Sequence, residues 1–227
     1  MSRVARFTKE NSLGLFFGII FLLTLCGQFF AGWAQFNNDQ HAQGLDQISA
    51  VGYLLSSDFA ADVAENWQSE YLQFLLYIVA TVWFVQRGSP ESAELDDVGL
   101  ESDEEQKVRE HATADSPAWA RVGGVRTAVF SWSLPLVMGA IFLASWVVQS
   151  VAGWASYNEQ RLQQLQGTIT WGSYLLNADF WSRTLQNWQS EFLAVGSMAV
   201  LSVYLRQRGS SESKPVGAPH GATGQSG

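Results

Sequence analysis

A charge-free stretch dominates the N-terminal part of the chain. Residues 13–34 read LGLFFGIIFLLTLCGQFFAGWA and include no Asp, Glu, Lys or Arg. As a helix that rises 1.5 Å per residue, about 22 residues cross the ~30 Å hydrocarbon core of a bilayer. A second charge-free run covers residues 129–157, with Pro135 near its start. Both runs predict transmembrane helices.

Two shorter apolar runs, residues 71–85 and 192–205, lie further along the chain. Each alone is too short to span a bilayer and is compatible with a buried core helix. They reach about 20 residues if the preceding Trp-Gln-Ser and the flanking polar residues lie in the interfacial zones. We therefore predict an all-α integral membrane protein with four transmembrane helices, at about residues 12–35, 67–86, 129–156 and 188–206.

The first apolar run has an alternative interpretation as a cleaved signal peptide. A basic leader precedes it, and Gly-Trp-Ala at residues 32–34 has the small-x-small pattern of a cleavage site. The run is longer than the usual apolar core of a signal peptide, about 7–15 residues. The same tripeptide also recurs at residues 153–155, deep in the chain. We expect the segment to be retained.

The sequence contains an internal duplication. Residues 12–92 align without gaps onto residues 133–213, and about two-fifths of the aligned pairs are identical. The longest shared motifs are NWQSE, at residues 66–70 and 187–191, and QRGS, at residues 86–89 and 207–210. Each copy is expected to form a helix, a loop and a second helix. Because each copy has an even number of spans, both insert the same way round, which predicts two parallel repeats.

The basic residues predict an orientation. Of the 13 Lys and Arg residues, all but Arg161 and Arg183 lie in the N-terminal leader, between residues 87 and 126, or from residue 206 onward. Cytoplasmic loops carry the excess of Lys and Arg in membrane proteins. We therefore expect both termini and the central linker to be cytoplasmic. The loops around residues 36–69 and 157–190 are expected to face outward.

These features divide the chain into four parts. Residues 1–92 form the first repeat and residues 127–208 the second. The linker, residues 93–126, is acidic, and the tail, residues 209–227, is rich in Gly, Ser and Pro. Both compositions are typical of disordered segments, so we expect a disordered cytoplasmic linker and tail.

Polar residues of the shared NWQSE motif form the candidate site. Asn66 and Glu70 are four residues apart and share a helix face, and Asn187 and Glu191 repeat them in the second copy. At the outer interface these four side chains would form a two-fold site for a cation or a polar ligand. The alternative is that the two carboxylates bond loop backbone or lie in the headgroup layer. That placement is far less costly for a charge than the bilayer midplane.

Gln28 and Gln149 occupy equivalent depths in the first and third predicted spans. Buried amides in lipid usually bond across helices, so we expect interhelical hydrogen bonds rather than a pore lining. The three His residues lie outside the predicted spans and Cys26 is the single Cys, so no metal site and no cofactor are predicted. A net charge of −8 argues against a nucleic-acid partner.

The sequence resembles a family of bacterial membrane proteins known only as a domain of unknown function. The resemblance rests on residues 66–73 (NWQSEYLQ) and 86–92 (QRGSPES), with residues 10–13 (ENSL) near the start. It covers the ordered parts of both halves, although the second copy departs from the pattern at Pro135 and Arg206. The resemblance implies a bacterial envelope membrane protein. Together with the four predicted spans, it leads us to expect a multi-pass protein of the bacterial plasma membrane. It implies no activity and no catalytic residue.

Three classes of function are compatible with these features. We expect a non-enzymatic membrane scaffold or accessory subunit, whose partners are the lipid bilayer and either another membrane protein or further copies of the chain. The alternative is a small channel or transporter that acts as an oligomer, with the two Gln and the two Glu residues near its path. A membrane enzyme would need titratable groups in a cleft, and the sequence contains no nucleophile elbow, phosphate loop or CxxC motif.

Overall fold

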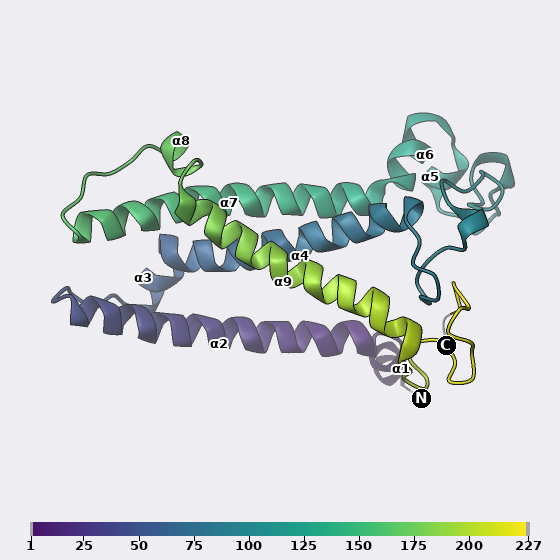
Figure 1. The fold of residues 1–227 in the computed structure, drawn as a ribbon, viewed down its shortest axis with the longest axis horizontal. Coiled ribbons are helices and arrows are strands. Elements are labelled where there is room, and N and C mark those ends of the chain that lie inside the picture. Colours follow the sequence, from purple (N-terminus) through teal and green to yellow (C-terminus); the bar gives the residue numbers. More distant parts are fainter. Residues whose placement is uncertain (1, 226–227) are drawn as a thin grey trace. The chain divides into compact units, whose positions relative to one another are not determined.

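The structure, a computed structural model, describes residues 2–225, so the outermost residues of the predicted first repeat and tail lie outside it. The described residues form helices, turns and loops without a strand, which confirms the all-α prediction. Figure 1 shows the helices in their order along the chain. The chain divides into two compact units. The first comprises the residues up to Val63 with Ala152–Gly167, and the second comprises Ala64–Val151 with the residues from Thr168 onward.

The first unit is built on the long helix α2 (Ser12–Ala42), which follows the short helix α1 (Arg3–Glu10). Ser2 begins α1, because its side chain accepts a hydrogen bond from the Ala5 amide at 3.3 Å. α2 runs through the whole apolar stretch and continues into the polar residues that follow it. It ends before Gly44, whose φ of 70° is a conformation that glycine adopts without a steric penalty.

Tyr53 is the centre of the core of the first unit. It lies in the short helix α3 (Ala50–Leu54) and is 2% exposed. Its ring contacts Phe29, Phe36 and Phe59 at centroid distances of 5.9, 5.7 and 5.5 Å. Gly32 of α2 allows this approach, because a Cβ at position 32 would clash with the Tyr53 hydroxyl.

Two side chains of α2 hold the loop that leads into α3. Asn37 donates to the Ile48 carbonyl at 3.1 Å and accepts from the Ile48 amide at 2.8 Å. The indole of Trp33 donates to the same carbonyl at 2.9 Å. Trp33 and Asn37 are one helical turn apart, so they share a face. The loop is therefore fixed to the side of α2 that also carries Gly32 and Phe36.

Three helix segments form the second unit: residues 64–83 of α4 (Ser57–Trp83), residues 133–151 of α7 (Ser133–Gln163), and α9 (Ala178–Tyr204), which follows α8 (Trp171–Tyr174). Trp146 of α7 is the aromatic centre of this unit. Its ring lies 6.2 Å from both Phe180 and Trp181 and 6.0 Å from Trp188. Phe180 also contacts Tyr174 at 5.6 Å, at the positions that Phe59 and Tyr53 occupy in the first copy.

The helix bounds repeat along the chain. α2 and α7 are each 31 residues long, and α4 and α9 are each 27 residues long. The bounds of α7 and α9 are those of α2 and α4 shifted by the offset of the sequence alignment. Pro135 lies in the first turn of α7, where its missing N–H removes no helical hydrogen bond. The apolar run that contains it is split at Trp132, where α6 (Gly124–Ser131) ends.

The same turn follows α4 and α9. We call these segments the QRGS turns; they comprise residues 86–92 and 207–213. The Gln86 amide donates to Ser92 Oγ at 2.8 Å, and the Gln207 amide donates to Ser213 Oγ at 2.9 Å. The glycines at positions 88 and 209 have φ values of 87° and 81°, which other residues rarely adopt. The two turns therefore share their hydrogen bonds as well as their sequence.

The linker and the tail belong to the second unit. The linker contains η1 (Leu95–Asp97), η2 (Arg109–His111) and α5 (Ala118–Arg121). In the tail, the buried ammonium of Lys214 donates to the carbonyls of Pro219, His220 and Ala222 at 3.2, 2.8 and 3.1 Å. The Gly88 amide donates to Thr223 Oγ1 at 3.0 Å, which ties the tail to the first QRGS turn. Disorder of the linker and tail in solution stays a prediction.

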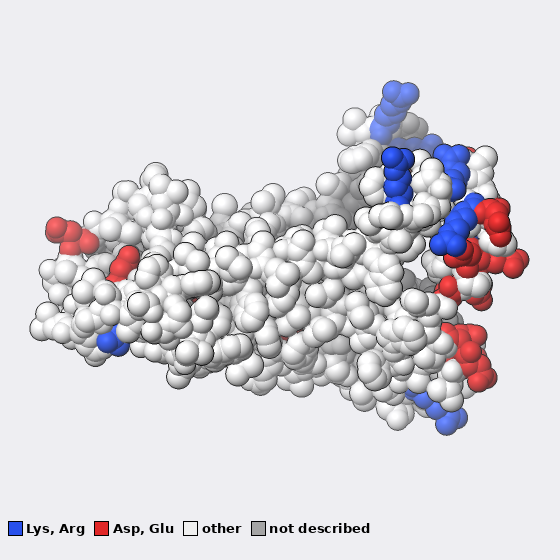
Figure 2. All heavy atoms as spheres, turned by 90° about the horizontal axis from the view of Figure 1, so that it is seen from above, with Lys and Arg blue, Asp and Glu red and all other residues white. Residues whose placement is uncertain are grey.

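Two of the described helices, α2 and α7, are long and apolar enough to cross a membrane. No residue of the most apolar stretch of α2 is buried. In the most apolar stretch of α7, only 17% of the residues are buried. Leu13 and Leu23 are 72% and 67% exposed. Figure 2 shows that the surface over the helices is almost free of charged atoms, which gather toward the helix ends. Membrane spans at α4 and α9 stay a prediction.

The Gly32→Ala substitution tests the packing of α3 on α2. The added methyl would push the buried Tyr53 out of its aromatic cluster, so we expect the free energy of unfolding to fall by about 1–3 kcal/mol. Thermal or chemical unfolding of the detergent-solubilised protein measures this. Gly27→Ala is the matched control, because a Cβ at Gly27 meets no atom within 4 Å. Equal losses for the two variants would contradict the close approach.

Candidate functional site

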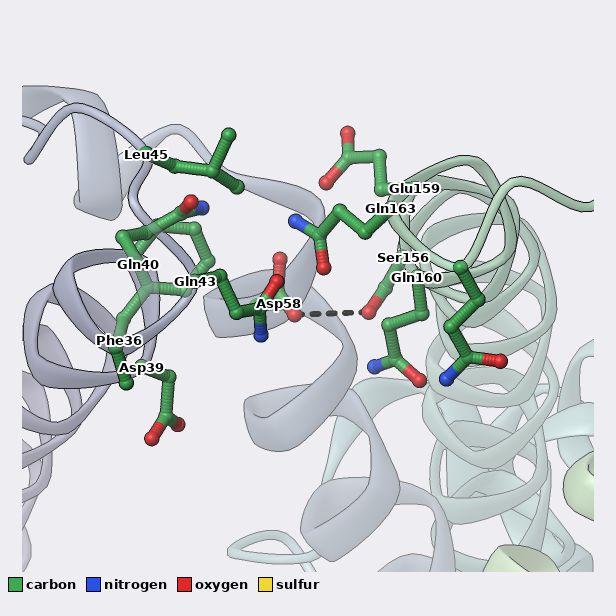
Figure 3. Close-up of a pocket in the computed structure, with 12 residues that line it drawn as sticks. Phe36, Asp39, Gln40, Gln43, Leu45, Asp58, Ser156, Glu159, Gln160 and Gln163 are labelled. Atoms are coloured by element: carbon green, nitrogen blue, oxygen red, sulfur yellow. Dashed lines mark hydrogen bonds between the residues drawn. The ribbon is translucent and has the colours of Figure 1, made fainter.

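A polar cleft of about 720 Å³ lies within the first unit, and we call it the outer cleft (Figure 3). Its volume is in the range of ordinary ligand sites. The last turns of α2 and α7 extend past their apolar runs and supply most of its walls, and α4 supplies one residue of its first turn. The lining residues are Phe36, Asp39, Gln40, Ala42, Gln43, Leu45, Asp58, Ser156, Glu159, Gln160, Gln163 and Gln164.

Asp58 lies between the α2 and α7 walls of the outer cleft (Figure 3). Its Oδ1 accepts a hydrogen bond from Ser156 Oγ at 2.8 Å. Ser56 caps α4, because its hydroxyl accepts a hydrogen bond from the Phe59 amide at 3.2 Å. Since Ser56 caps the helix, the Asp58 carboxylate is available to the cleft.

The outer cleft is negatively charged. Three carboxylates line it, those of Asp39, Asp58 and Glu159, and its lining includes no Lys, Arg or His. Glu159 lies beyond the apolar run of α7. Partial removal from water in the cleft, followed by the nearby Asp58 carboxylate, raises the pKa of Glu159 above its ordinary value. Between residues 2 and 225, no three His, Cys, Asp or Glu side chains are grouped so as to hold a metal ion.

The four residues predicted as a two-fold site lie in the second unit. Glu70 and Glu191 are near enough for their carboxylates to repel each other. Asn187 donates instead to the Arg183 carbonyl of its own helix at 3.0 Å. Asn66 and Glu70 are exposed. The structure therefore places the two carboxylates within electrostatic range of each other, and a ligand for this group stays a prediction.

A buried polar layer crosses the second unit. Gln149, which is 1% exposed, donates from α7 to Thr184 Oγ1 of α9 at 3.3 Å. Trp188 of α9 donates to Gln68 Oε1 of α4 at 2.7 Å, and both Gln68 and Thr184 are fully buried. Gln28 is half-buried, and its side chain makes no hydrogen bond to residues 2–225.

The sequence does not predict the buried positions of Gln68 and Thr184. Gln68 belongs to the shared NWQSE motif, but its counterpart Gln189 is exposed. The repeat therefore could not identify which copy is buried. Thr184 aligns with Val63, so the duplication gives no signal for it either. Only the packing of three helices reveals this layer.

Arg183 organises a second group of charges that the sequence did not reveal. Its guanidinium donates to Glu65 Oε1 at 2.9 Å and lies 3.5 Å from Asp179 Oδ2. Tyr174 donates to the same Asp179 oxygen at 3.1 Å. Burial, together with Asp179, raises the pKa of Tyr174. Burial by itself lowers the pKa of Arg183, but the hydrogen bond and charge of Glu65, with Asp179, raise it overall.

The Arg183→Gln substitution tests this group. It would leave the Glu65 carboxylate, whose side chain is 13% exposed, without its ion pair. We expect the free energy of unfolding to fall by about 1–3 kcal/mol, because an unpaired buried charge keeps its desolvation penalty. The double variant with Glu65→Gln should recover part of this loss, since it removes the charge. Additive losses in chemical unfolding would show that the two side chains are not coupled.

Comparison with known proteins adds a family but no activity. The family described as Domain of unknown function (DUF6766) matches residues 4–225, which include both copies and the linker. No curated protein and no solved structure matches the chain. The resemblance noted from the motifs is thus shown at the level of a domain of unknown function, and its bacterial origin stays a prediction.

Proposed function

The chain belongs to the DUF6766 family, a domain of unknown function, and from that premise we propose that it is a non-enzymatic integral membrane protein that acts as a scaffold or accessory subunit. The observation that carries the proposal is the exposure of α2. Its apolar residues are not buried in a core, although removing a Leu or Phe side chain from water is favourable by about 1.5–3 kcal/mol. Lipid chains or the apolar faces of partner helices would remove these side chains from water.

The proposal includes four spans. α4 and α9 are 27 residues long, or about 40 Å at 1.5 Å per residue. Each has a carboxylate, Glu70 or Glu191, that precedes its charge-free run. In four spans both termini and the linker lie on the side with most Lys and Arg, which supports a cytoplasmic location. With the bacterial resemblance, this favours the plasma membrane.

The outer cleft offers groups that can bind a ligand. Its lining provides carboxylates, amides and one hydroxyl, which accept or donate hydrogen bonds. The partners we propose are the lipid bilayer and either another membrane protein or further copies of the chain.

Cysteine labelling tests the topology. In a Cys26→Ser background, we expect Asp46→Cys and Gln166→Cys to react with a membrane-impermeant maleimide in spheroplasts. Ser102→Cys, in the linker, should react only after lysis. Labelling of all three, or of Ser102→Cys alone, in sealed cells would contradict the orientation. Recovery in the soluble fraction would contradict membrane insertion.

Purification tests the subunit role. The full-length protein, extracted from native membranes in mild detergent, should elute with a membrane-protein partner at fixed stoichiometry or as an oligomer of defined mass. A lone monomer in several detergents would contradict the proposal.

The buried polar layer favours a second candidate, a small channel or transporter. Gln68, Gln149 and Thr184 place amides and a hydroxyl between three helices, and such groups line the polar paths of membrane proteins. Liposomes with the purified protein distinguish the candidates. A scaffold predicts solute and ion flux equal to that of empty liposomes. Flux that Gln149→Leu abolishes would favour the channel instead.

A further inference from the structure

The outer cleft has walls from equivalent parts of the two copies. The end of α2 and Gln43, which follows it, form one wall, and the end of α7 and Gln164, which follows it, form the other. Gln43 and Gln164 are equivalent residues of the duplication, as are Asp39 and Gln160. Hydrogen-bond acceptors therefore face the cavity from both walls, with Asp58 between them (Figure 3).

The charges of the outer cleft restrict its ligand. Asp39, Asp58 and Glu159 disfavour an anion, since no basic side chain in the lining compensates them. A metal ion needs several ligand atoms at about 2.0–2.6 Å from one point, and residues 2–225 contain no such group of acidic side chains. Carboxylates that are spread over a cavity fit a ligand whose positive charges are also spread.

The amides add a second requirement. Five Gln side chains line the cavity, and each offers a carbonyl acceptor as well as an amide donor. Ammonium groups donate up to three hydrogen bonds each and accept none. They therefore match the carboxylates in charge and the Gln carbonyls in hydrogen bonding. Partial removal from water, followed by the nearby Asp58 carboxylate, raises the pKa of Glu159, which agrees with a cleft whose negative charges are not compensated.

We propose that the outer cleft binds an extended organic cation with two or more ammonium groups, of the polyamine class, with Asp58 and Glu159 pairing with ammonium groups. Charge-assisted hydrogen bonds between ammonium and carboxylate are the strongest available to such a ligand. The cleft holds about 720 Å³, which leaves room for an extended chain of this kind. Access from outside the cell rests on the proposed orientation, but binding itself does not.

Calorimetric titration of the full-length protein in detergent with spermidine, at low ionic strength, tests the proposal. We expect saturable binding, weakened about tenfold or more by Asp58→Asn and by Glu159→Gln, because each removes one charge-assisted pair. Asn at position 58 can still accept from Ser156, so this variant should fold. The matched control is Asp46→Asn, which removes an exposed carboxylate of the same outer loop outside the cleft lining and should leave the affinity unchanged.

Several outcomes would overturn the proposal. Equal weakening by Asp46→Asn would show diffuse attraction to a negative surface, which salt screens. Tighter binding of Mg²⁺ than of spermidine, lost in the same variants, would assign the cleft to a divalent cation. Binding of sorbitol with similar affinity would assign it to neutral polyols. Absence of spermidine binding to the folded wild-type protein would also overturn it. Cysteine labelling decides the proposed membrane role separately, so the two failures are distinguishable.

Discussion

Apolar side chains that point outward along a helix need a solvent other than water. α2 presents Leu, Phe and Ile residues over its charge-free run without burying them, and this condition determines where polar groups can lie. The backbone is satisfied within each helix, as a bilayer requires. The charge-free runs of α2 and α7 contain no charged side chain, whereas Glu70 and Glu191 lie in the middle of α4 and α9. The amides of Gln68 and Gln149 are buried in the second unit.

The second unit shows how polar groups are accommodated inside such helices. Gln149 and Thr184 bond each other, as do Trp188 and Gln68. Around them Trp146 contacts aromatic rings from α9. Interhelical bonds of this kind contribute roughly 0.6–2 kcal/mol each in membranes. They also define the register of the three helices, because an amide one turn away would lose its partner in this layer.

The sequence alone predicted the helical class and the positions of the apolar helices, because charge-free length and period are local properties. It did not predict that α2 and α7 extend well beyond their apolar runs, since Gln-rich and Asn-rich turns carry little signal for either helix or loop. The outer cleft depends on that extension. Glu70 and Glu191 were recognised from the repeat, whereas the Arg183 group was not.

The ion pair of Arg183 could not be predicted from the repeat, because the two copies differ at this position. It stands where the first copy has Asp62, and its partner Glu65 aligns with Gln186. An ion pair that joins non-equivalent positions leaves no trace in an alignment of the two copies. Trp146 likewise aligns with Leu25. The duplication thus specifies the common backbone, and the residues that differ specify how each copy packs.

The two QRGS turns have a practical consequence for dissecting the molecule. Gly88 and Gly209 share a left-handed conformation, so an alanine at either would suffer the same backbone strain. Only Gly88 lies against the tail, where a Cβ would clash with the His220 carbonyl, whereas a Cβ at Gly209 meets no atom within 4 Å. The Gly209→Ala substitution is therefore an internal control for Gly88→Ala. The difference between the two substitutions measures what the contacts of position 88 with the tail and with Val203 add to the intrinsic strain of the turn.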